Sequence, residues 1–181
     1  MKRNEIESLL PEIFQRTIRP GDPLFALLEV MEALHAPSEE VLADLEGFFD
    51  PYRTPDSFVP YLARWVDLDR FLSRDLDQAK DLTLHSFPPG LGRLRELIAA
   101  AAFLSKWRGT ARGLLRFLET ATGIPGFEID EQVPGADGLP RPFHIRVHVP
   151  EAARRYRELI EHIVEMEKPA YVTFELDLSS E

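Results

Sequence analysis

The sequence has 181 residues, which suffices for one domain or two small ones. Its 31 acidic and 21 basic side chains give a formal net charge of −10. Because phosphate backbones are bound by clustered Lys and Arg, this balance argues against nucleic acid as the main partner. The sequence contains no Cys, which excludes disulfides, thiolate nucleophiles and Cys-ligated zinc.

No segment has the pattern of a secretory signal or of a membrane span. Residues 1–14 lack the apolar stretch of a signal peptide. The longest apolar run, residues 97–104, is far shorter than the roughly 20 residues that a membrane-spanning helix needs. We therefore expect a cytoplasmic protein with no membrane partner.

Apolar residues at helical spacing predict helices over the first two thirds of the chain. The first predicted helix covers residues 23–35, with Asp22 as its N-cap, and a second begins at Pro37. Residues 68–90 have a weaker pattern, which predicts one or two short helical turns. The first helix has one apolar stripe, made by Leu24, Leu27, Leu28, Met31 and Leu34.

A helix over residues 92–107 is predicted with an unusual distribution of apolar residues. Its second half, residues 97–104, is apolar all round, which is typical of a helix surrounded by protein on every side. Four alanines in it would let neighbouring backbones approach closely. We therefore expect a partner subunit to cover one face of this helix.

After Gly123 the apolar period changes from 3.6 to 2. Alternation predicts strands at residues 126–131, 143–149 and 171–178, with an amphipathic helix over residues 151–167. The sequence therefore predicts an α+β fold that is mainly helical in its N-terminal two thirds and ends in a small β-β-α-β unit with a three-stranded sheet.

The solvent-facing residues of these strands suggest their order. The middle segment presents His144, Arg146 and His148, while the other two strands present carboxylates. Opposite charges on neighbouring strands stabilise a sheet, so we expect the His/Arg strand to be central.

The segment KWRGTARGLLRF, residues 106–117, combines glycines with basic residues. A phosphate-binding loop would follow a strand, but a predicted helix precedes Arg108. We therefore expect Gly109 to end one helix in a left-handed conformation and Thr110 to cap the next. Gly113 would mark a close contact.

No pattern supports catalysis, a metal site or a cofactor. On a strand, His144 and His148 would lie roughly 13 Å apart, too far to bind one zinc ion. No Ser lies in a nucleophile-elbow pattern, and the many carboxylates are typical of solvated faces. One alternative remains open, namely a small-ligand or carbohydrate-binding module that uses the Pro- and Gly-rich loop 132–142 and the His144/Arg146/His148 face.

Segments along nearly the whole chain resemble the tail protein I family of contractile-tailed phages and related extracellular injection systems. The most specific are the Phe-Asp-Pro segment that leads to Trp65, the Arg108-Gly109-Thr110 turn, and Lys168-Pro169-Ala170 before a strand. Residues 70–90 match only loosely. The resembling segments are LLPEIFQRT, DPLFALLEVMEALHAPSEEVLADL, FFDPYRTPDSFVPYLARWVDLD, KWRGTARGLLRFLETATG and KPAYVTFEL.

The resemblance implies a non-enzymatic baseplate wedge subunit without a cofactor. It would bridge larger wedge subunits, commonly two copies per copy of this chain, around the hub and spike and near sheath-proximal baseplate proteins. The implied division is a helical arm or bundle region over residues 1–107 and a helix plus small α/β unit over residues 108–181. The candidate interface and joint residues are Trp65, Leu97, Ala99, Ala100, Ala101, Ala102, Phe103, Trp107, Arg108, Gly109, Thr110 and Gly113.

Overall fold

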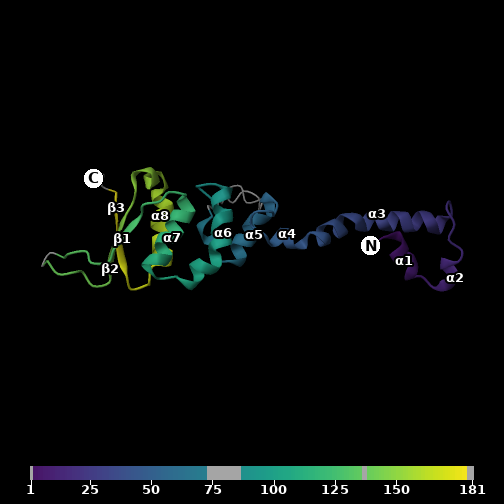
Figure 1. Cartoon of the computed structure of the whole chain (residues 1–181), viewed down its shortest axis with the longest axis horizontal. Helices are drawn as coiled ribbons and strands as arrows, with labels where there is room; N and C mark the ends of the chain where they lie inside the picture. Colours follow the sequence, from purple (N-terminus) through teal and green to yellow (C-terminus); the bar gives the residue numbers. More distant parts are fainter. Residues whose placement is uncertain (1, 73–86, 136–137, 179–181) are drawn as a thin grey trace, which may run out of the picture. The chain divides into compact units, whose positions relative to one another are not determined.

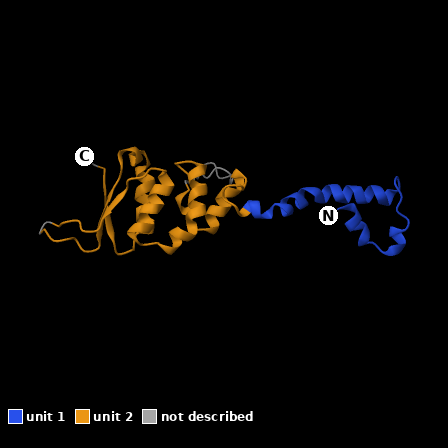
Figure 2. Ribbon diagram, viewed as in Figure 1, with its two compact units in different colours: residues 1–48 blue, residues 49–181 orange. Residues whose placement is uncertain are grey.

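The computed structural model describes residues 2–72, 87–135 and 138–178. The chain divides into two compact units, Met1–Phe48 (unit 1) and Phe49–Glu181 (unit 2), which Figure 2 distinguishes by colour. The sequence predicts a different division, between residues 107 and 108, into two functional regions. That division stays a prediction.

Unit 1 is helical and has a very small core. Ile6 of the first helix and Leu28 of the third are buried, and the guanidinium of Arg3 lies 4.5 Å from the ring centre of Phe25. The helices are α1 (Arg3–Ser8), α2 (Glu12–Gln15), α3 (Pro23–Ala43) and α4 (Leu45–Phe49), whose last residue belongs to unit 2.

Helix α3 runs through Pro37, so the prediction of a new helix beginning there is wrong. Proline has no N–H to donate to the carbonyl of Ala33 one turn earlier. Both residues are exposed, and water can therefore satisfy that carbonyl. Asp22 occupies the predicted N-cap position with extended backbone angles, but its side chain makes no capping hydrogen bond.

Unit 2 contains a continuous hydrophobic core between its helices and one face of a sheet (Figure 1). The fully buried side chains include Leu94, Leu118 and Ile160. Its elements are η1 (Asp56–Phe58), α5 (Val59–Trp65), η2 (Asp69–Phe71), α6 (Leu91–Lys106), α7 (Ala111–Thr122), β1 (Glu128–Asp130), β2 (His144–His148), η3 (Glu151–Tyr156), α8 (Arg157–Glu167) and β3 (Thr173–Asp177).

The loop before η1 is held by one arginine. The guanidinium of Arg95, on α6, donates to the carbonyl oxygen of Thr54 at 2.9 Å and to that of Pro51, and it pairs with Asp56. These three contacts fix the Phe-Asp-Pro segment against α6. Of the predicted turns within residues 68–90, η2 is present, and the expectations for residues 73–86 lie outside the described residues.

The sheet has the order β1-β2-β3, so the prediction that the His/Arg strand is central is confirmed. Strand β1 pairs antiparallel with β2, and β3 pairs parallel with β2 after the crossover through η3 and α8. The register sets Arg146 between Asp130 and Glu175, which places opposite charges side by side as expected. The predicted α+β class and three-stranded C-terminal sheet are confirmed.

Candidate interaction surfaces

An exposed apolar surface of unit 1 lies on α3. With about 100° between successive helical residues, five exposed side chains fall within an arc of about 120°. We call them the α3 stripe. The exposed fraction reaches 72% at Leu34, although apolar spacing on this helix would ordinarily predict a buried face. The members of the α3 stripe are Leu27, Val30, Leu34, Val41 and Leu42.

A second apolar surface consists of aromatic rings near the start of unit 2. Trp65 is 62% exposed and stacks on Phe49, with the ring centres 5.6 Å apart. Phe58 meets Trp65 edge-on at 6.1 Å and also contacts Tyr61. Exposed aromatic clusters of this kind are enriched in protein interfaces, because large rigid rings bury much area at little entropic cost.

The helix that the sequence predicted to be apolar all round, α6, is covered mostly by its own unit. Leu97, Ile98 and Leu104 are buried in the core of unit 2, and Phe103 packs against that core. Ala99 and Ala102 are exposed, while Ala100 and Ala101 are partly buried. The part of α6 around Ala99 and Ala102 that remains for a partner is therefore narrow.

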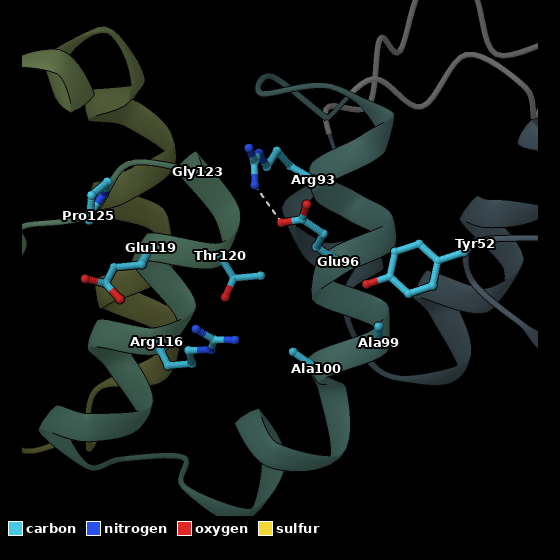
Figure 3. A pocket seen from close by; sticks show the side chains of 10 residues that line it. All are labelled: Tyr52, Arg93, Glu96, Ala99, Ala100, Arg116, Glu119, Thr120, Gly123 and Pro125. Carbon is cyan, nitrogen blue, oxygen red and sulfur yellow. Dashed lines mark hydrogen bonds and ion pairs between the residues drawn. The ribbon is translucent and has the colours of Figure 1, made fainter.

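Ala99 and Ala100 line an open groove between α6 and α7 with a volume of about 510 Å³ (Figure 3). Arg116 and Thr120 extend into it from α7, opposite Arg93, whose guanidinium lies 2.6 Å from the carboxylate of Glu96. The remaining lining residues are Tyr52, Glu119, Gly123 and Pro125.

The turn between α6 and α7 has the left-handed glycine and the N-cap that the sequence predicted. Gly109 has a left-handed φ of 76°, and the Oγ1 atom of Thr110 accepts a hydrogen bond from the N–H of Gly113 at 3.1 Å. A Cβ atom on Gly113 would lie 2.1 Å from the carbonyl oxygen of Trp107, so only glycine fits there. The guanidinium of Arg112 covers the Trp107 ring at 4.6 Å.

Arg108 joins this turn to the end of α8 through a buried carboxylate. Its Nε atom lies 3.6 Å from Oε2 of Glu167, and its Nη2 donates to the carbonyl of Met166 at 3.2 Å. Arg70 lies 2.5 Å from Oε1 of the same carboxylate. Burial raises the pKa of Glu167 above its ordinary value, and this effect outweighs the opposite one of the two arginines. Asp67 pairs with Arg70 at 2.8 Å and completes the cluster.

The solvent-facing side of the sheet consists of paired charges. Arg146 lies 2.6 Å from Glu175, and His148 lies 3.0 Å from Asp177. His144 bonds to Thr173 at 2.8 Å. The hydrogen bond from Arg146 lowers the pKa of the Glu175 carboxyl. Each of the three basic side chains already contacts a neighbour on β3. This face therefore gives little support to the alternative that the protein is a small-ligand or carbohydrate-binding module.

Comparison with known protein families gives a match over most of the chain. The family described as phage tail protein (Tail_P2_I) matches residues 24–171. The chain belongs to this phage tail family. No curated protein matches the chain. The resemblance inferred from the sequence segments is therefore confirmed, and with it a structural role in a phage tail and contacts with other tail proteins.

The family match of this tail protein includes the α3 stripe, the aromatic cluster and the α6–α7 turn. In the described part of the chain, no helix is long and apolar enough to cross a membrane. The exposure of Val30, Val41 and Leu42, and the buried Glu167 cluster, escaped the sequence reasoning. Apolar spacing could identify the α3 face but not what covers it, and a single buried Glu has no local signature.

Proposed function

We propose that this tail protein is a structural wedge subunit of the baseplate of a contractile phage tail or a related contractile injection system. In this proposal it is not an enzyme and holds no cofactor. It joins larger wedge subunits around the central hub and spike, next to sheath-proximal baseplate proteins, and it enters the particle during assembly in the cytoplasm. Family membership and the α3 stripe support this assignment.

The α3 stripe is the observation on which the proposal rests. Exposure of an apolar helix face to water is unfavourable in free energy. Such faces are most commonly covered by packing against other helices. The 21 residues of α3 are long enough to present such a face over several turns. We infer that α3 bundles with helices of the larger wedge protein, of which two copies would meet each copy of this chain.

The other candidate residues have subordinate roles in this proposal. Trp65 and the exposed Ala99 and Ala102 would make further contacts with neighbouring subunits. The turn at Arg108-Gly109-Thr110 would act as a rigid joint between the helical region of residues 1–107 and the unit of residues 108–181. The contact of Arg70 with Glu167, which crosses this division, supports a stiff connection there.

Co-purification with the larger wedge protein of the same tail tests the proposal. The double substitution Leu27→Glu/Leu34→Glu places two charges in the α3 stripe and should abolish co-purification. The matched control Ala26→Glu/Ala33→Glu adds the same charges one residue earlier, outside the stripe, and should retain it. Circular dichroism should show equal helix content in both variants. Co-purification of the stripe variant at the wild-type level would contradict the proposal.

A further inference from the structure

The outer edge of β3 is open in the described structure. The N–H of Thr173 donates to the carbonyl of Phe143 at 2.9 Å, and the carbonyl of Asp177 accepts from Val149 at 3.0 Å, so both point toward the β2 side. Successive residues of a strand direct their backbone groups to opposite edges. The N–H and C=O groups of Phe174 and Leu176 therefore point outward, and no described strand pairs with them.

A groove of about 570 Å³ follows this edge, between β3 and α8. Phe174 and Leu176 contribute its apolar part, and both also pack against the core of unit 2. His162 lines it as well, but its ring nitrogen already contacts the carbonyl of Arg70 at 3.0 Å. The groove thus has a fixed apolar surface directly beside unpaired backbone groups.

Carboxylates dominate the charge of the groove. Glu158, Glu161 and Glu165 line it from α8, and Glu175 lines it from β3. Three of them already have a cation nearby, since Glu161 lies 2.8 Å from Arg157, Glu165 lies 3.2 Å from Lys168 and Glu175 lies 2.6 Å from Arg146. These cations are not among the described lining residues, and such partly exposed ion pairs are weak, so a cation of a partner can share the carboxylates. Glu158 and Glu165 are exposed. A strand placed beside β3 would direct alternate side chains toward these carboxylates, because side chains alternate between the two faces of a sheet.

We propose that the β3 edge binds an extended basic segment of another protein by strand addition. Backbone hydrogen bonds to Phe174 and Leu176 provide the affinity, and alternate Lys or Arg side chains that enter the groove pair with the glutamates of α8. This contact is separate from the α3 stripe and lies on unit 2, so it holds whether or not α3 binds the wedge protein.

The same charges disfavour a second copy of this chain as the occupant. Pairing two β3 edges would bring the glutamates of two α8 helices toward one another, and like charges at close range are destabilising. The excess of carboxylates along the groove therefore favours a partner of opposite charge.

A synthetic octapeptide of alternating lysine and valine is a suitable probe of the full-length protein. It should bind, and it should slow hydrogen exchange at the amides of Phe174 and Leu176. A control peptide has the same sequence but carries a methyl group on the backbone nitrogen of each lysine. It keeps every side-chain charge but loses the backbone hydrogen-bond donors next to the groove. Its affinity should fall by about tenfold or more.

Variants of the protein separate this groove from general attraction to an acidic surface. Glu158→Lys/Glu165→Lys should weaken binding by about tenfold or more. The control Glu29→Lys/Glu40→Lys makes the same charge change on α3 and should bind nearly as the wild type does. Thermal melting confirms that both variants fold. Equal affinity of the two peptides, equal loss in the two variants, or a β3-mediated homodimer would each overturn the proposal.

Discussion

Units 1 and 2 use similar apolar helices in opposite ways. In the described part of unit 1, Ile6 and Leu28 are the buried apolar side chains, and the α3 stripe is exposed. In unit 2, by contrast, α5, α6, α7 and α8 turn their apolar faces into one shared core. The difference teaches that helical amphipathicity identifies a face to be covered but does not identify the chain that covers it.

The largest expected effect comes from making the same Leu→Ala substitution in each unit. Leu118→Ala, in the core of unit 2, should lower the free energy of unfolding by about 2–5 kcal/mol, because a cavity replaces a fully buried side chain. Leu34→Ala, on the exposed α3 stripe, should change it by no more than about 0.5 kcal/mol. Urea unfolding of the isolated protein measures both. Similar losses at the two positions would mean that the stripe is already covered in the isolated chain.

A pair of glycines tests how rigid the α6–α7 turn of unit 2 is. Gly113→Ala should destabilise the protein by about 1–3 kcal/mol, because the new Cβ would overlap the Trp107 carbonyl. Gly92→Ala is the matched control on α6, where nothing lies within 4 Å of the new Cβ. It should stabilise by up to about 1 kcal/mol through higher helix propensity. Thermal melting of both variants would show the opposite signs, and equal effects would remove the close contact as the cause.

The smallest effect concerns the buried carboxylate of unit 2. The pKa of Glu167 is raised in the folded state above its ordinary value of 4.5. Between these two pKa values the folded state binds more protons than the unfolded state, so the contribution of Glu167 to stability falls as the pH rises through this window.

Glu167→Gln should remove that part of the pH dependence. Denaturant unfolding at a series of pH values from 4 to 8 measures it, with the exposed Glu165→Gln as a control on the same helix. An unchanged slope in the Glu167 variant would show that burial does not raise the pKa of this carboxyl.

The sequence predicted much of unit 2 because its signals are local. Period-2 alternation located all three strands, and opposite charges on their wet faces predicted the central position of β2. The cap of Thr110 and the left-handed Gly109 followed from residue types whose conformational preferences are strong.

The missed features depend on distant parts of the chain or on exposure. Burial of Leu97 and Leu104 within unit 2, rather than by a partner, results from the packing of α5 and α7, which no local pattern encodes. The cluster at Glu167 joins residues almost 100 positions apart. The strong helix-breaking tendency of proline gave the wrong boundary at Pro37, because an exposed helix tolerates a missing hydrogen bond better than a buried one.

Pro37 has a consequence for the way in which α3 opens. Helix–coil transitions spread residue by residue along the series of backbone hydrogen bonds of a helix. In α3 the bond that residue 37 would donate is missing, about two thirds of the way along the helix. Fraying that starts at the Ala43 end therefore reaches a weakened position at Pro37. The short segment after Pro37 can therefore open as a unit while the longer segment before Pro37 stays helical.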